Sequence, residues 1–198
     1  MRLDLRLTNR WIDQLWCQAI IVFLFEDDLP QKNYLSRLNE KLAGLPGELL
    51  DNQFLTGKKG ELLLVAPQDR IKAERLFFVG LGPVDGFTPE IMSSVLRIVS
   101  PSFESLQIDE FAILTPCAES DEIDRFSSII KLITSNFVEY FTGNSDDIHC
   151  LLKLVFFVDK ESVSTLQLIE KKLDFNFNPE IYHSIVIDNS RGQINGKV

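Results

Sequence analysis

The stretch "RLFFVGLGPVDGFTPE" (Arg75–Glu90) decides the fold, because it runs from a strand through a turn into a helix. "RLFFVGLG" is apolar up to its Gly-x-Gly turn, which predicts a buried strand. In "FTPE", Thr88 is placed to cap a helix, Pro89 fits the first helical position, and Glu90 favours the positive end of the helix dipole. A strand followed directly by a helix is the repeating unit of an α/β protein.

The same alternation extends along the chain. "AIIVFLF" (Ala19–Phe25) is apolar throughout, which predicts a strand covered on both faces, whereas "LDLRLT" (Leu3–Thr8) alternates as a half-buried or edge strand does. Further strands are predicted at Glu110–Thr115, Leu152–Val158 and Ser184–Asp188. Helices are predicted where Leu35, Leu38 and Leu42 fall at helical spacing, after the Thr88 cap with Ile91, Val95 and Ile98 on one apolar face, and at Asp121–Tyr140 and Val163–Leu173. Gly44 with Pro46 is predicted to end the first of these helices, and Pro101 the second. The pattern predicts an α/β fold, a three-layer α/β/α sandwich.

The segment "FLTGKKGELLLV" (Phe54–Val65) predicts a hairpin of two strands around a Gly-Lys-Lys-Gly turn. Together with the N-terminal strand, this hairpin makes the predicted sheet mixed, although mostly parallel. We find no internal repeat, low-complexity tract or linker, so a single domain is predicted over residues 1–180. The polar residues 181–198 are predicted to form a short extension that is partly disordered.

Composition and charge narrow the class of protein. The chain has 198 residues, a formal net charge of −9 and a pI of about 4.8, so its average surface repels nucleic acid and anionic membranes. Its three cysteines include no Cys-x-x-Cys pair, which fits a reducing compartment. The N-terminus lacks the apolar core of a signal peptide, and the longest apolar run, Ala19–Phe25, is too short to span a bilayer. These features predict a cytoplasmic protein.

Several stretches, in their order along the chain, resemble one family. A Gly-Lys-x-Gly-Glu segment within Phe54–Val65 precedes "KAERLFFVGLGP" (Lys72–Pro83), and "FTPE" then opens a helix. "AIIVFLFEDD" (Ala19–Asp28) resembles the opening strand of the same family, and "NFVEYF" before "LLKLVFFV" (Asn136–Val158) resembles its closing helix and strand. Most of the chain is thus similar to the N-terminal domain of the leucyl aminopeptidase, or cytosol aminopeptidase, family of dimetal peptidases.

The resemblance implies a fold and a place for the chemistry. It implies a macro-domain-like fold, a mixed sheet with helices on both faces. In that family the chemistry belongs to a separate C-terminal domain with two metal ions (zinc or manganese), a catalytic lysine and an Asn-Thr-Asp-Ala-Glu-Gly-Arg segment. "DNSRG" (Asp188–Gly192) is only a superficial echo of that segment, because it lacks the second acidic ligand. No family catalytic residue maps onto this chain, so the resemblance implies a domain that is not an enzyme and holds no cofactor.

Gly80 and Gly82 allow two interpretations. Their backbone amides, with the helix start at Thr88 nearby, resemble a phosphate-binding turn. Alternatively, the two glycines supply backbone freedom where the strand leaves the sheet. A dinucleotide fingerprint needs a third glycine that opens the helix, whereas here Pro83 and Asp85 intervene, and a carboxylate repels phosphate. The sequence favours the conformational role.

A small-ligand pocket at the carboxyl ends of the strands is a second hypothesis, since open α/β sheets usually bind ligands there. Its candidate binding residues are Gly80, Gly82, Thr88, Thr115 and Cys117. Cys117 lies just past a predicted strand, but no histidine is paired with it in sequence, so it is a minor candidate for a nucleophile. The macro-domain-like fold suggests a nucleotide or ADP-ribose-like ligand, although the Asn-Ala-Asn and triple-glycine segments typical of such sites are absent.

No metal site is predicted from the sequence. His149 and Cys150 are adjacent, so on a strand they would point to opposite faces. Zinc requires several ligands that converge on one point. The acidic pair Asp27–Asp28 is more typical of a solvated loop than of a cation site.

Three classes of function follow from these observations. The first is a stand-alone, non-catalytic binding or regulatory module whose partner is a protein, either a full-length peptidase of the family or a second copy. The second is binding of a small ligand, and the third, DNA binding known for some family members, is disfavoured by the net charge of −9. Trp11, Trp16, Phe175 and Phe177 would mark a partner surface if exposed. The alternative for the two tryptophans is packing on one face of a short helix.

Overall fold

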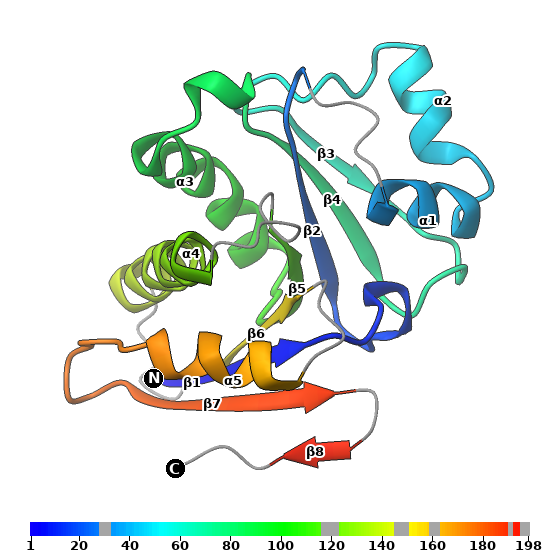
Figure 1. Cartoon of the computed structure of the whole chain (residues 1–198). Coiled ribbons are helices and arrows are strands. Elements are labelled where there is room, and N and C mark those ends of the chain that lie inside the picture. The colour runs from blue at the N-terminus through cyan, green and yellow to red at the C-terminus, as the bar shows by residue number, and fades with distance from the viewer. Residues whose placement is uncertain (28–32, 116–122, 145–150, 159–162, 190–191, 195–198) are drawn as a thin grey trace.

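The computed structural model of the chain describes residues 1–27, 33–115, 123–144, 151–158, 163–189 and 192–194 (Figure 1). The strands are β1 (Arg2–Thr8), β2 (Ala19–Leu24), β3 (Leu62–Val65), β4 (Arg75–Gly80), β5 (Glu110–Leu114), β6 (Leu151–Phe157), β7 (Tyr182–Asn189) and β8 (Gly192–Ile194). The α-helices are α1 (Asn33–Lys41), α2 (Leu45–Asp51), α3 (Pro89–Ser105), α4 (Ile123–Asn144) and α5 (Val163–Lys172), with short 3-10 helices η1 (Ile12–Gln14) and η2 (Val84–Gly86). The predicted alternation of strands and helices is confirmed.

All the strands belong to one eight-stranded sheet, in the order β3-β4-β2-β5-β6-β1-β7-β8. Neighbours from β4 to β7 pair in parallel, whereas β3 and β8 pair antiparallel with β4 and β7 at the two edges. Parallel strands need long crossover connections, and helices lie in these connections: α1 and α2 after β2, α3 after β4, α4 after β5 and α5 after β6. The sheet is therefore mixed and mostly parallel, as predicted.

Helices cover both faces of this sheet. Figure 1 shows α3, α4 and α5 on one side and α1 and α2 on the other. The first group packs on a core that includes Ile21 and Phe23, and the second packs on a core that includes Ile20 and Val22. Strand β2 separates the two cores and is buried over its whole length, as its sequence predicted. The three-layer α/β/α sandwich is confirmed.

Strand β1 lies inside the sheet, between β6 and β7, so it is half-buried rather than an edge strand. Leu3, Leu5 and Leu7 point into the core that α3, α4 and α5 cover. Asp4 and Arg6 lie on the other face, where a carboxylate oxygen and a guanidinium nitrogen are 3.0 Å apart. This hydrogen bond raises the pKa of the Arg6 guanidinium. The polar residues of this alternating strand thus form an ion pair on the face of the sheet opposite to the leucines.

The predicted hairpin over Phe54–Val65 is wrong. Only Leu62–Val65 (β3) is a strand, and it pairs antiparallel with β4 rather than with the residues before it. Gly57 and Gly60 have φ angles of 72° and 79°, in the left-handed region that interrupts a strand. The backbone before β3 is bonded elsewhere, because the Thr56 and Gly57 amides donate to the Glu61 side chain and the Gly57 carbonyl accepts from the Gly82 amide.

Pro101 does not end α3, which continues to Ser105. The amide that proline lacks would have bonded to the carbonyl of Arg97, and Arg97 is exposed, so water can satisfy that carbonyl. The apolar face of the helix also differs from the predicted one, because Ile98 is 47% exposed. The buried residues of α3 are Met92, Val95, Leu96, Val99, Ser100 and Phe103. Packing on both sides of the proline keeps the helix intact.

Helix α2 and strand β8 were not predicted. Gly44 and Pro46 follow the end of α1, as expected, but Pro46 also lies in the first turn of α2, where a missing amide costs little. Strand β8 pairs with β7, so the sheet extends into residues 181–198, which were predicted to be a partly disordered extension. Residues 190–191 and 195–198 lie outside the described part of the chain.

Candidate functional site

Gly80, the last residue of β4, is required by a close backbone contact. A Cβ atom built on it would lie 2.0 Å from the carbonyl oxygen of Lys58. The Gly80 amide donates to the carbonyl of Glu61 at 2.9 Å, and its carbonyl accepts from the amide of Gly60 at 3.0 Å. The two glycine-bearing stretches that carry the family resemblance are therefore packed against each other.

Gly82 is required by its backbone conformation, since its φ angle is 80°. Its amide donates to the carbonyl of Gly57 at 2.9 Å, and the amide of Leu81 donates to the carbonyl of Leu24 at 2.8 Å. With the bond from Gly80, three successive amides are used inside the protein. A phosphate could bind them only by displacing these carbonyls. The conformational role of the glycines fits this geometry, and ligand binding by them stays a prediction.

The carboxylate of Glu61 holds the opposing turn in place. It accepts from the amides of Thr56 and Gly57 at 2.8 and 2.7 Å, and from the Thr56 hydroxyl at 3.1 Å. Gly57 is tightly enclosed, because a Cβ there would lie 2.7 Å from the carbonyl oxygen of Phe25. We call Thr56–Glu61 and Gly80–Gly82 together the double turn. It closes the carboxyl ends of β2 and β4.

Thr88 is the N-cap of α3, as predicted. Its backbone is extended, and its hydroxyl accepts from the amide of Ile91 at 3.4 Å. A hydrogen bond with Thr88 also lowers the pKa of the exposed Glu90 carboxyl. The polar groups of Thr88 therefore serve the helix start, and its ligand-binding role stays a prediction.

Thr115 follows β5 directly and is fully buried. Its hydroxyl oxygen has no hydrogen-bond partner among the residues that the structure describes. Gly80 and Thr115 lie at the carboxyl ends of β4 and β5, the two strands that flank β2. The structure therefore brings these predicted residues to the same end of neighbouring strands. Cys117 falls in residues 116–122 and His149 in residues 145–150, both outside the described residues.

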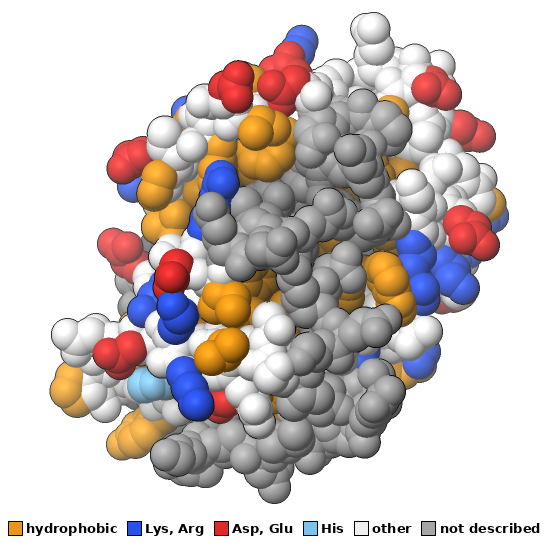
Figure 2. All heavy atoms as spheres, in the orientation of Figure 1, with side chains coloured by type: hydrophobic (Ala, Val, Ile, Leu, Met, Phe, Trp, Pro, Cys, Tyr) orange, Lys and Arg blue, Asp and Glu red, His pale blue; other side chains and the backbone are white. Residues whose placement is uncertain are grey.

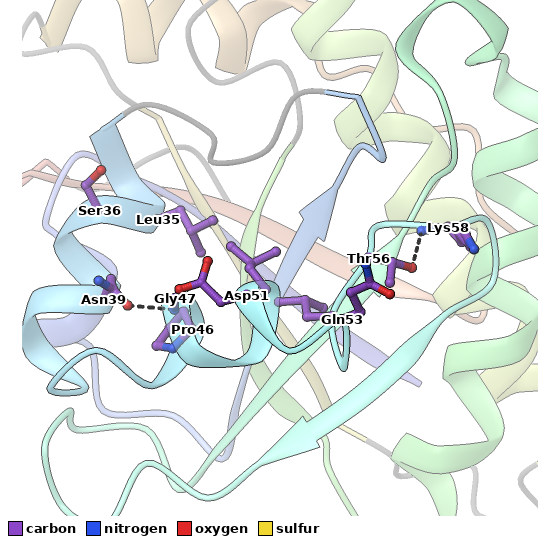
Figure 3. Close-up of a pocket in the computed structure, with 11 residues that line it drawn as sticks. Leu35, Ser36, Asn39, Pro46, Gly47, Asp51, Gln53, Thr56 and Lys58 are labelled. Carbon is purple, nitrogen blue, oxygen red and sulfur yellow. Dashed lines mark hydrogen bonds between the residues drawn. The ribbon is translucent and has the colours of Figure 1, made fainter.

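A groove between α1, α2 and the double turn was not predicted. It encloses a volume of about 690 Å³. Figure 3 shows residues from α1, α2 and the segment that follows α2 around it. Asn39 fixes the two helices, because its side-chain oxygen accepts from the amide of Gly47 at 2.8 Å. The lining is Leu35, Ser36, Asn39, Pro46, Gly47, Leu50, Asp51, Gln53, Leu55, Thr56 and Lys58.

Sequence reasoning missed this groove because it missed α2. Leu45 and Leu49 carried the signal for this helix, since they lie four residues apart, a spacing that suits a helix. Leu35 and Leu55 are buried in the floor, while Asp51 and Lys58 are exposed at the rim. An apolar floor with a few polar groups at its rim is the usual composition of a small-ligand site.

Trp11 and Trp16 have opposite environments. The ring of Trp11 stacks on Phe157 at 5.4 Å, and the Arg37 guanidinium lies 4.2 Å from its centroid. Arg37 also binds the buried carboxylate of Asp13, with contacts of 2.9 and 3.3 Å. Trp16 is 77% exposed. The prediction that both rings pack on one face of a short helix is therefore wrong for Trp16.

Phe175 and Phe177 form a parallel stack with centroids 4.9 Å apart, and His183 meets both rings edge-on. Both phenylalanines are half-buried against the core that α3, α4 and α5 cover. The two rings therefore pack in the segment between α5 and β7 and do not form an exposed aromatic surface. Trp16 is thus the predicted aromatic that the structure leaves most accessible.

Metal and thiol chemistry find little support in the described residues. Among them, no three His, Cys, Asp or Glu side chains are grouped so that they could hold a metal ion. Burial raises the pKa of the Cys17 thiol to about 12, so this thiol stays protonated at neutral pH. No helix in the described ranges is both long and apolar enough to cross a membrane.

Solved structures share this architecture and define the class as a macro-domain-like α/β domain. A Trypanosoma brucei macrodomain matches with a TM-score of 0.61 and 12% identity, over 85% of this chain and 66% of its own. An Oceanobacillus iheyensis macrodomain with ADP matches with a TM-score of 0.59 and 12% identity, over 82% of this chain and 86% of its own. A mutant of tomato leucine aminopeptidase matches with a TM-score of 0.65 and 17% identity, over 86% of this chain and 34% of its own.

The family follows from the sequence comparison. The family model "Cytosol aminopeptidase family, N-terminal domain" matches residues 21–139, so the chain belongs to the cytosol aminopeptidase family. A probable cytosol aminopeptidase of Alkaliphilus metalliredigens is 23% identical over 168 residues, which are 82% of this chain and 34% of that protein. Another, from a Sulfurihydrogenibium species, is 24% identical over 111 residues, or 56% and 22%. The chain thus covers about a third or less of these curated relatives, and the family model that it matches is that of the N-terminal domain.

Proposed function

We propose that this domain is a non-catalytic binding or regulatory module of the cytosol aminopeptidase family, acting in the cytoplasm without a metal or cofactor of its own. Its partner is a protein, either a full-length peptidase of the family or a second copy of the chain. The observation that carries the proposal is the exposure of Trp16, which leaves 77% of the residue accessible.

An exposed tryptophan next to a lysine suits protein recognition. The Lys72 ammonium lies 5.7 Å from the centre of the Trp16 ring, and this cation–π contact orients the ring. Tryptophan is enriched among the few residues that dominate binding energy at protein interfaces. Trp11 packs against the core beneath α1 and α2, whereas the ring of Trp16 is not part of that core.

The test compares Trp16→Ala with Leu168→Ala, a matched change at a leucine that is 46% exposed on α5. Each variant is titrated with a purified full-length cytosol aminopeptidase, and self-association is measured in parallel by sedimentation. We expect Trp16→Ala to weaken binding by about 2 kcal/mol, or roughly thirtyfold, and Leu168→Ala to leave it unchanged. No association with either partner at ~100 μM, or equal binding by both variants, contradicts the proposal.

A second candidate function is binding of a nucleotide or an ADP-ribose-like ligand. It is favoured by the macro-domain-like fold, since solved macrodomains of this fold hold ADP and ADPR. The groove of about 690 Å³ also lies within the range of roughly 300–1,000 Å³ that ligand sites occupy. At 12–13% identity, these neighbours show the fold alone.

Thermal unfolding with and without ADP-ribose tests this candidate. A ligand at about 100 times its dissociation constant adds roughly 2.7 kcal/mol. For a chain of this size the midpoint should rise by roughly 5–10 °C. Leu50→Trp fills the groove, whereas Thr115→Val alters the edge of the sheet, so the variant that abolishes the shift identifies the site. An unchanged midpoint for the parent chain contradicts the candidate.

DNA binding finds no support in the charge distribution. The formal net charge is −9. Over the face in Figure 2, acidic and basic side chains are interspersed among the described residues. Phosphate backbones are recognised by concentrated positive charge, so we do not propose a nucleic-acid partner.

A further inference from the structure

Strand β3 presents a hydrogen-bonding edge that no described strand uses. It is the first strand of the sheet order and pairs with β4 alone among the described strands. The Gly80 amide bonds to the Glu61 carbonyl, and the register places Leu63 opposite Phe78 two residues further on. Because hydrogen-bonded pairs alternate in an antiparallel ladder, Leu62 and Leu64 direct their amides and carbonyls away from β4.

The side chains of this edge are apolar and incompletely buried. No residue of β3 is fully buried, and Leu64 is 47% exposed. Ile98 of α3, also 47% exposed, approaches the same end of the strand, since its Cδ1 atom lies 3.1 Å from a Cβ built on Gly60. Natural edge strands are usually protected by lysine, proline or a bulge, and Leu62–Val65 carries no charge and no proline.

We propose that β3 is an interaction edge and that its occupant is β3 of a second copy of this chain. The proposal rests on the proposed function as a protein-binding module, and it names the surface and the partner. Two such edges can pair only if the residues whose amides and carbonyls point away from β4 lie opposite each other. The register that bonds Leu62 and Leu64 in this way sets Leu62 of one copy opposite Leu64 of the other and places the two-fold axis at Leu63.

Charge favours this antiparallel arrangement over a parallel one. The exposed Lys58 and Lys59 precede β3, and the exposed Asp69 follows it. An antiparallel pair sets the lysine turn of one copy near Asp69 of the other, whereas a parallel pair would set the two lysine turns side by side. Arg70 lies next to Asp69 and offsets part of this attraction, so Leu62 and Leu64 of the two copies supply most of the contact.

Leu62 and Leu64 of the two copies form a row that is continuous across the two-fold axis. Leu62 packs partly against the core that α3 covers, so Leu62 and Leu64 share the face of the sheet on which Ile98 lies. In the pair, these residues from both copies meet as one apolar strip. The two sheets join into a continuous sheet through this edge, which is a common mode of strand addition.

Sedimentation equilibrium over a concentration series tests the surface. We expect the parent chain to dimerise in the micromolar range, and Leu64→Lys to raise the dissociation constant at least tenfold. Leu168→Lys is the matched control, because Leu168 is 46% exposed on α5, near the opposite edge of the sheet. A dissociation constant that Leu64→Lys leaves unchanged overturns the proposal.

A cysteine scan tests the register. Residues opposite each other in a non-hydrogen-bonded pair have Cα atoms about 4.5 Å apart, within the range of a disulfide. Leu63→Cys should therefore form an intermolecular disulfide under mild oxidant. Val65→Cys, which would face Glu61 of the second copy, should not. The parent chain is oxidised in parallel to account for its own three cysteines.

The two proposals fail in different ways. A parent chain that stays monomeric at ~100 μM but binds a family peptidase overturns strand pairing and leaves the proposed function standing. Self-association that resists Leu64→Lys, or equal cross-linking of Leu63→Cys and Val65→Cys, does the same. Absence of any association overturns both.

Discussion

The double turn and the β3 edge are adjacent in sequence and opposite in their hydrogen bonding. Glu61 completes the double turn and Leu62 begins the edge strand. In the double turn, three successive amides and a carboxylate all have partners inside the protein. On the edge, the outward amides and carbonyls of β3 face no described strand. The two glycine turns that carry the family resemblance are thus bonded inside the protein, and the strand available to a partner follows one of them directly.

This difference separates recognition of a family from recognition of a function. Gly57, Gly80 and Gly82 occur where a side chain would clash or where φ is positive. Such requirements hold whatever the domain binds, so the motif reports the fold. An interaction surface needs only exposed apolar side chains and free backbone groups, which many sequences provide.

Gly80→Ala should break the double turn and give the largest effect. The new methyl group would lie 2.0 Å from a backbone carbonyl oxygen, so the strand end or the opposing turn must move. We expect a loss of about 4 kcal/mol or more in the free energy of unfolding, measured with denaturant. Gly143→Ala in α4 is the control, because no atom lies within 4 Å of its added methyl. Equal stability of the two variants would show that the close contact is absent.

Glu61→Gln should weaken the same turn without a steric clash. The amide keeps the shape of the side chain, but it removes the negative charge from the oxygen that accepts from both backbone amides and replaces the oxygen that accepts from the Thr56 hydroxyl by an NH2 group. We expect a loss of about 2–3 kcal/mol in the free energy of unfolding. Glu74→Gln, at a side chain that is 63% exposed and paired with Arg75, should cost less than about 0.5 kcal/mol. A loss no larger than that control would mean that Glu61 does not hold the turn.

The elements that sequence predicted correctly have local causes. The apolar run of β2, the Gly-x-Gly end of β4 and the Thr88 cap of α3 each follow from a few neighbouring residues. The errors involve distant partners. Gly57 and Gly60 look like a hairpin turn until the Glu61 carboxylate is seen to bind the backbone of Thr56 and Gly57.

The candidate site was predictable only in part, for the same reason. Sequence places Gly80 and Thr115 at the ends of two strands, and the sheet order shows that these strands flank β2. It does not show that the Gly80–Gly82 amides are already bonded, or that the Thr115 hydroxyl has no partner within the described part of the chain. The groove depends on the packing of α2 against α1, which no local pattern defines.

Thr115→Val sharpens the comparison. Thr115 lies at the same carboxyl end of the strands as the double turn, but its hydroxyl is buried without a described partner. Removing that hydroxyl should raise the free energy of unfolding by about 1 kcal/mol. Thr8 is the matched control: it is equally buried, and its hydroxyl accepts from the amide of Arg10 at 3.0 Å. Thr8→Val should therefore lower the free energy by about 1 kcal/mol. Changes of the same sign would show that the two hydroxyls do not differ in bonding.

Leu64→Thr gives the smallest effect and tests the edge directly. Threonine suits a strand, and Leu64 is 47% exposed, so little packing is lost. We expect a change below about 0.5 kcal/mol in the free energy of unfolding, measured in protein dilute enough to be monomeric. Leu63→Thr, at the half-buried neighbour that packs on the core beneath α1 and α2, should cost about 1–2 kcal/mol. Equal losses would place Leu64 in the core and leave no free edge, whereas the expected difference shows a leucine that folding does not require.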